Sequence, residues 1–157
     1  MQTRTFRLMA TAAALTMTGL AHAGQCPADK LAANDLPGAA TAPIGVVDTE
    51  LASIELANEN VKLDQRRLRL RHMTIAPGGI VPLHSHEDRP ALIMVNAGEI
   101  YEYSSKCAVP ILHKAGEVAR EFMGTKHWWK NTGTRAVDLT IGDIVNDKKP
   151  MTMEKMM

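Results

Sequence analysis

Short apolar runs separated by turn residues are the feature of this sequence that most limits its possible folds. From residue 46 onward, such runs recur between Gly, Pro, Asn, Asp and Ser residues, at 54–56, 68–75, 92–95, 100–103, 109–112 and 137–145. Segments this short and this regularly spaced are typical of the β-strands of a sandwich or barrel. No segment of 20 to 50 residues repeats, which excludes a solenoid. The sequence therefore predicts an all-β domain over residues 46–145.

One segment alternates strictly, Arg-Leu-Arg-Leu-Arg-His at positions 67–72. Because a strand sends successive side chains to opposite faces, Leu68, Leu70 and His72 share one face and the three arginines share the other. We expect the leucines to face the core and the arginines to face solvent. His72 is then either a core histidine with its hydrogen bonds satisfied or a group that points into the same interior as the candidate functional site described below.

The first 23 residues have the three parts of a secretory signal peptide. Arg4 and Arg7 form a basic start, an apolar run follows over 8–20, and Ala21-His22-Ala23 matches an A-x-A cleavage site. The apolar run is shorter than the ~20 residues that a membrane-spanning helix needs. We therefore expect cleavage after Ala23 and a periplasmic or secreted mature protein without a membrane anchor.

Export changes how the two cysteines, Cys26 and Cys107, are interpreted. In an oxidising compartment an even number of cysteines favours a disulfide, although two free thiols or a pair of soft metal ligands are the alternatives. Residues 24–45 are rich in Ala, Pro and Gly and are expected to form an extended N-terminal arm. Residues 146–157 are expected to form a flexible, Met-rich tail.

Charge and composition exclude several classes of function. The formal net charge is only +1 and no block of Lys or Arg occurs, which argues against nucleic acid as a partner. The hydrophobic fraction of 45% is too high for a disordered chain. A small molecule is the remaining class of partner that we expect.

Histidines with metal-ligand spacing provide the strongest functional signal. After the turn signal Pro77-Gly78-Gly79, His84 and His86 are separated by one residue, so a strand would place both on one face. A second segment, 124–131, carries His127, and alternation places Trp129 and Asn131 on the same face as this histidine. A third imidazole would complete a set of three nitrogen donors with open positions for water or substrate.

Two motifs in these segments resemble those of the cupin family. The pattern G-x5-H-x-H-x3,4-E-x6-G matches at Gly78, His84, His86 and Gly98. The pattern G-x5-P-x-G-x2-H-x3-N matches at Gly116, Gly124, His127 and Asn131. The resemblance covers about residues 60 to 145, with two departures: Phe122 replaces the proline of the second motif, and Ala91 replaces the metal-binding glutamate of the first.

The resemblance implies a jelly-roll β-barrel of two antiparallel sheets that encloses a metal ion. The implied ligands are His84, His86 and His127, and the implied cofactor is a divalent transition metal. Iron is the ion that we favour, with Mn, Ni, Cu and Zn as alternatives. Three-histidine cupins similar to this one include thiol dioxygenases, so an Fe(II)-dependent dioxygenase acting on a small molecule is one expectation. A homodimer is also implied.

Three further residues are candidates for a catalytic role. Arg89 could bind a substrate carboxylate near the position left by Ala91, or it could be a solvent-facing turn residue. Tyr101 could line the pocket or simply pack, and Trp129 could form an apolar wall over the metal. His113 lies in a turn-like segment and is expected at the surface.

The C-terminal methionines suggest a different function. Met151, Met153, Met156 and Met157 offer four thioether sulfurs, which are soft ligands that select Cu(I). The interpretation that we favour for these residues is compositional noise at a chain end. The alternative to an enzyme is therefore a non-catalytic periplasmic protein that binds a metal or a small ligand and handles copper through its tail.

Overall fold

The computed structural model describes residues 24–148, and these residues form an antiparallel β-fold. The expected signal peptide and the tail methionines lie outside the described residues. One short 3₁₀ helix, η1 (Ala28–Lys30), precedes the strands. The strands are β1 (Ile44–Glu55), β2 (Arg66–Ser85), β3 (Ala91–Ala97), β4 (Glu99–Ser104), β5 (Ile111–Lys114), β6 (Val118–Glu121), β7 (Lys126–Lys130) and β8 (Val137–Asn146). The all-β prediction is confirmed.

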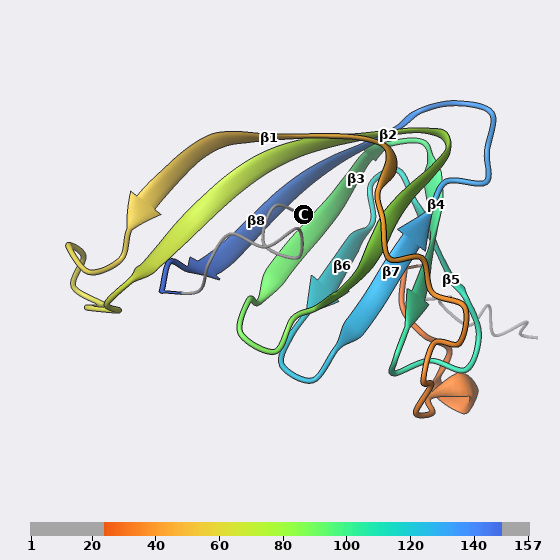
Figure 1. Ribbon diagram of the computed structural model, residues 1–157, viewed down its shortest axis with the longest axis horizontal. Helices are drawn as coiled ribbons and strands as arrows, with labels where there is room; N and C mark the ends of the chain where they lie inside the picture. Colours follow the sequence, from red (N-terminus) through yellow and green to blue (C-terminus); the bar gives the residue numbers. More distant parts are fainter. Residues whose placement is uncertain (1–23, 149–157) are drawn as a thin grey trace, which may run out of the picture.

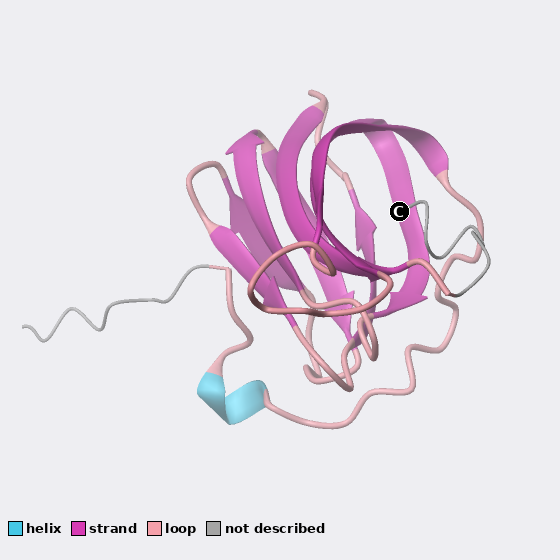
Figure 2. Cartoon of the chain, turned by 90° about the vertical axis from the view of Figure 1, so that its left-hand side faces the viewer, coloured by secondary structure: helices cyan, strands magenta, loops and turns pink. Residues whose placement is uncertain are grey.

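The long strand β2 connects the two halves of the barrel. Hydrogen bonds link the strands in the order β5-β4-β7-β2-β8-β3-β6, and β1 pairs with β2 beside this path. In Figure 1, β1, β2 and β8 lie side by side along one wall, and β4, β5 and β7 lie on the opposite side. Figure 2 shows how the curved strands enclose an interior. The result is the nearly closed antiparallel barrel of a jelly roll.

Strand β2 bends at Pro77-Gly78-Gly79 and so pairs with strands of both halves of the barrel. The turn expected at these residues is therefore a bend within one strand. Up to Ile75, β2 pairs with β8, and from Ile80 it pairs with β7. Gly79 lacks a side chain for a steric reason, since a Cβ there would lie 2.7 Å from the carbonyl oxygen of Ala76. The Asn131 side-chain amide donates to the carbonyl oxygens of Ile75 and Ala76 at 3.1 and 3.0 Å and fixes the bend.

The core is formed by the inward-facing residues of both halves. Strand β8 shows the expected period of two without interruption, with every second residue buried from Val137 to Val145. The buried apolar cluster comprises Met73, Ile75, Val81, Ala91, Ile93, Val95, Ile100, Ala119, Trp129, Val137, Leu139 and Ile141. Because these residues come from both halves, a single core holds the two walls together.

The faces of β2 are the reverse of those expected from its alternating segment. Leu68 and Leu70 are 42% and 43% exposed, whereas Arg69 and Arg71 are buried. His72 lies on the outer side, where its Nε2 is 2.6 Å from a carboxylate oxygen of Asp138. The period of two was correct, but the assignment of the polar side to solvent was wrong.

Acidic partners from other strands explain why the arginines lie inside. Arg69 donates two hydrogen bonds to Asp143 of β8, at 3.0 and 2.8 Å, and Arg71 lies 3.4 Å from the same carboxylate. Arg71 also pairs with Asp48 of β1. Burial raises the pKa of Asp48 above its ordinary value, although the charge of Arg71 opposes this shift. The interior therefore holds a paired ionic network beside its apolar core.

The N-terminal arm is attached to the barrel by a disulfide and by backbone hydrogen bonds. Cys26 is bonded to Cys107, which is the pairing that the even cysteine count favoured. Ala32 donates to the carbonyl of Lys106, and Leu31 forms an isolated bridge with Cys107. Among residues 24–148, no helix has the length and apolar character needed to cross a bilayer.

Candidate metal centre

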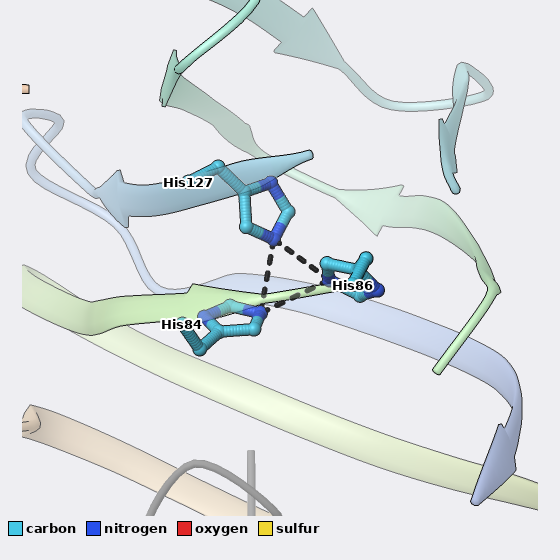
Figure 3. Close-up of side chains that lie close together, drawn as sticks. All are labelled: His84, His86 and His127. Carbon is cyan, nitrogen blue, oxygen red and sulfur yellow. Dashed lines mark hydrogen bonds between the residues drawn. The ribbon is translucent and has the colours of Figure 1, made fainter. Parts of the chain in front are cut away.

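Three histidine rings meet inside the barrel at the point where β2 and β7 pair. His84 lies opposite His127 in the strand register, and His86 follows directly after the end of β2. Figure 3 shows the Nε2 atoms of the three rings pointing toward one another. The distances are 3.1 Å between His84 and His86, 3.0 Å between His86 and His127, and 2.9 Å between His84 and His127. We call these three residues the histidine triad.

Backbone carbonyls fix the orientation of two of the rings. The Nδ1 of His84 lies 2.9 Å from the carbonyl oxygen of Pro82, and the Nδ1 of His86 lies 2.6 Å from that of Arg89. Each Nδ1–H therefore donates to a carbonyl, which leaves the Nε2 lone pair facing the centre. Burial lowers the pKa of His84 well below its ordinary value and that of His86 to about 3, so both rings are neutral and able to bind a metal.

The third ring, His127, has carboxylates behind it instead of a carbonyl. Its Nδ1 lies 3.2 Å from Glu102 and 3.4 Å from Glu121, and both acids are buried. Burial alone would lower the pKa of His127, but the charge of Glu121 and the hydrogen bond to Glu102 outweigh it and raise the pKa to about 9. For the acid Glu102, burial acts in the other direction and would raise the pKa. Hydrogen bonds from His113 and His127 outweigh this effect and lower the pKa of Glu102 to about 2.

The donor set and its spacing fit a transition-metal ion. Imidazole nitrogens bind such ions at about 2.1 Å, so two nitrogens at a right angle on one ion lie about 3.0 Å apart, whereas a tetrahedral angle requires about 3.4 Å. The observed separations of 2.9 to 3.1 Å match the right-angled case. Such a facial set of three donors leaves further positions open, as in non-haem iron sites.

The space beside the histidine triad is small and mainly apolar. A cavity of about 20 Å³ adjoins His84 and His86, and its wall also includes Arg71, Met73, Val81, Ile93, Trp129, Leu139 and Ile141. This volume is about that of one water-sized probe. Any molecule that binds here without movement of the walls is very small, and Arg71 contributes the only formal charge among these wall residues.

Two of the three catalytic candidates, Trp129 and Arg89, lie beside the triad. Trp129 is buried, and its Nε1 lies 3.0 Å from the Nδ1 of His127. Arg89 is also buried, rather than facing solvent, and it contacts the triad through its backbone carbonyl. Tyr101 lies between the buried residues Ile100 and Glu102 of β4, so its side chain points to the opposite face of that strand.

Three residues behind His127 were missed by the sequence reasoning. Glu102 and Glu121 approach His127 directly, and the Nε2 of His113 lies 2.8 Å from Glu102. The surface position expected for His113 is wrong, because this residue is fully buried and its ring stacks on Trp129 at 4.7 Å. The alternation of β4 was a usable signal, since it places Glu102 on the same face as the buried Ile100.

The replacement of the motif glutamate by Ala91 is accompanied by acids on both neighbouring strands. In the strand register Ala91 lies opposite Glu121 of β6 and opposite Asp143 of β8. Neither acid occupies the vacated position, because Glu121 contacts the Nδ1 of His127 and Asp143 pairs with arginines. The triad therefore offers three imidazole nitrogens and no carboxylate, with the negative charge of Glu121 and Asp143 nearby.

Comparison with protein families places this site in a known class. Residues 71–142, which include the whole triad, match the family model described as the cupin domain. Residues 71–142 are a cupin domain. The family resemblance and the jelly-roll expectation are thereby confirmed. No curated protein sequence matches the chain.

Solved cupin structures show the same fold at low sequence identity. A structure titled as a predicted oxalate decarboxylase from Thermotoga maritima has a TM-score of 0.52 and 22% identity, over 69% of this chain and 94% of that one. The structure of KdgF from a Halomonas species has a TM-score of 0.51 and 12% identity, over 66% and 83% of the two chains. At these identities the likeness concerns the fold and not the reaction.

Proposed function

We propose that this cupin is an exported protein that binds a divalent transition metal at His84, His86 and His127 and uses it for oxygen chemistry on a small molecule. The observation that carries the proposal is the convergence of three Nε2 atoms within 3.1 Å of one another. Iron is the ion we favour, because a facial set of ligands with open positions suits non-haem Fe(II). Mn, Ni, Cu and Zn remain alternatives.

A bound ion of this kind would supply Lewis acidity and, in the case of iron, activation of dioxygen. The residues of the chain have separate tasks. His84 and His86 bind through Nε2 while their Nδ1 atoms stay fixed on backbone carbonyls. Glu102 orients His127 and makes its ring a stronger donor. Met73, Trp129 and their apolar neighbours limit the open side to a space of about 20 Å³.

A non-catalytic metal-binding protein is the second candidate, and the small cavity favours it. A space of about 20 Å³ accommodates water or dioxygen but not an organic substrate beside the ion, unless the walls move. In this alternative the barrel stores or delivers a metal, and Met151, Met153, Met156 and Met157 form a copper-collecting segment.

Export to the periplasm or the medium is supported by the disulfide. Cys26 and Cys107 are bonded, and disulfides persist mainly in oxidising compartments. The A-x-A sequence at residues 21–23 gives the proposed cleavage site.

Metal analysis tests the proposal. Protein purified from its native compartment and protein reconstituted anaerobically with Fe, Mn, Ni, Cu and Zn in turn are expected to hold one ion per triad. His84→Ala should remove that ion, whereas His72→Ala, which alters a histidine on the outer face, should retain it. If the full-length protein holds none of the five metals, the proposed site is wrong.

Oxygen consumption distinguishes the two candidates. Iron-loaded protein that consumes oxygen with a candidate thiol or diol supports the enzyme. Bound copper that is lost only when residues 151–157 are removed supports the binding protein.

A further inference from the structure

A second cavity lies on the other side of His127 from the triad centre, between the N-terminal arm and strands β4 and β6. Its volume is about 340 Å³. The arm contributes Gly24, Cys26 and Leu31 to its lining. The barrel contributes the buried acids Glu102 and Glu121 and, at the exposed rim, the bases Lys106 and Arg120. We call this space the arm cavity. The N-terminal arm, which the Cys26–Cys107 disulfide attaches to the barrel, forms one side of this cavity.

The two carboxylates in the arm cavity are buried and lack a basic partner of permanent charge. Glu102 and Glu121 are each 4% exposed. Within residues 24–148, the ion pairs of these two acids are formed only with the rings of His113 and His127. Two buried carboxylates near each other are costly unless cations or protons balance both charges. The proton that His127 holds at neutral pH balances one of the two.

A buried hydroxyl in the same lining is also unsatisfied. Thr125 is 4% exposed, and its Oγ1 has no hydrogen-bond partner among the described residues. Thr125 lines the arm cavity together with the two acids. A buried hydroxyl without a partner is rare in folded proteins and calls for an explanation such as an ion or a water molecule.

We propose that the arm cavity is a second cation site, in which Glu102, Glu121 and Thr125 bind a hard divalent cation such as Mn²⁺. Oxygen atoms of Glu102 and Glu121 and a nitrogen of His127 all lie within 4.8 Å of one another, which is a spacing suited to one ion. Carboxylate and hydroxyl oxygens are ligands that Mn²⁺, Mg²⁺ and Ca²⁺ prefer, whereas the imidazoles of the triad suit iron, nickel, copper and zinc. The two sites therefore differ in the ions that they prefer, and Mn²⁺ is a candidate for both, which is why the test below removes or fills the triad first.

The two sites adjoin each other through His127. This ring presents Nε2 to the triad centre and Nδ1 to the carboxylates of the arm cavity. The second site does not require an ion at the first, because none of its oxygen ligands belongs to the triad. The inference therefore stands or falls independently of the proposed function.

Mn²⁺ binding to a protein whose triad has been removed tests the inference. Equilibrium dialysis of the full chain carrying His84→Ala and His86→Ala is expected to give one bound Mn²⁺ per chain. Adding Glu121→Gln should abolish this binding, whereas adding Glu99→Gln, which alters an exposed acid at the start of β4, should preserve it. If the double variant binds no Mn²⁺, or if Glu121→Gln and Glu99→Gln bind it equally, the inference is wrong.

A second measurement avoids any dependence on the folding of the double variant. Wild-type protein whose triad is first filled with Zn²⁺ should still bind one Mn²⁺ per chain. In the same background Thr125→Val, which keeps the shape of the side chain, should weaken Mn²⁺ binding about tenfold. An unchanged affinity of the Thr125→Val variant for Mn²⁺, or no Mn²⁺ binding to the wild type at all, would overturn the inference. Failure of Zn²⁺ to bind would instead contradict the proposed function.

Discussion

Asp143 is the residue on which the buried ionic network depends. Its side chain is fully buried, accepts two hydrogen bonds from Arg69 and lies 3.4 Å from Arg71. Asp143→Asn leaves buried arginine charge uncompensated, so we expect a loss of about 3–5 kcal/mol in the free energy of unfolding. Asp138→Asn, on the outer face, is the control and should cost less than about 1 kcal/mol. Urea denaturation of the two variants measures both values, and equal midpoints would contradict the prediction.

Glu102 is expected to control the metal affinity of the triad without binding the ion there. The carboxylate joins the Nε2 of His113 to the Nδ1 of His127, at 2.8 and 3.2 Å. Glu102→Gln keeps the size of the side chain but removes the charge that strengthens His127 as a donor. We expect about 10-fold to 100-fold weaker Zn²⁺ binding, measured by competition with a chelator. The exposed Glu99→Gln should leave the affinity unchanged, and a similar loss in both variants would refute this role.

The limits of sequence reasoning are clearest for individual polar residues. His84, His86 and His127 could be predicted because local spacing and two motifs identify them. Alternation could have predicted the inward face of Glu102, but not the contacts that join Glu102 to His113 and His127, because these residues lie on strands that meet only in the fold. Arg69 and Arg71 were placed on the wrong face for the same reason, since Asp48 and Asp143 lie on other strands.

At the scale of elements, most of the strands followed from the sequence, but β6 (Val118–Glu121) and the pairing of the strands did not. The apolar runs gave the all-β class, and alternation gave the inward face of β8 correctly. The double role of β2 depends on the bend at residues 77–79, which resembles an ordinary turn in the sequence. The hydrogen bonds from Asn131 that convert it into a bend come from a segment far along the chain.

The N-terminal arm is the element whose attachment can be tested directly. The disulfide closes a loop with a sequence separation of 81 residues. In the chain-entropy account a loop of this length contributes about 4 kcal/mol by restricting the unfolded state. Replacing Cys26 and Cys107 together by serine should therefore lower the free energy of unfolding by an amount near this value. Urea denaturation of the variant and of the oxidised wild type provides the comparison, and unchanged stability would show that the arm is held by other contacts.

Export is a property of the whole molecule and can be read from its mature N-terminus. Cleavage after Ala23 would make Gly24 the first residue and leave Cys26 close to the new chain end. Intact-mass measurement of protein from the native host should give a chain that begins at Gly24. Ala23→Leu, which replaces the small residue of the A-x-A site, should leave the precursor uncut. An intact mass that matches the uncleaved wild-type chain would contradict the proposed export.

Assembly is the last whole-molecule expectation, and β1 is the surface that we expect to mediate it. In the part of the chain that the structure describes, β1 pairs only with β2, so its other edge offers unpaired backbone groups. Val47 and Leu51 of this strand are 67% and 58% exposed. A second copy related by a two-fold axis would satisfy both the backbone and the apolar side chains. Light scattering should give twice the mass of one chain, and the double substitution Val47→Lys and Leu51→Lys should give a monomer. A wild-type protein that stays monomeric at high concentration would rule out this assembly.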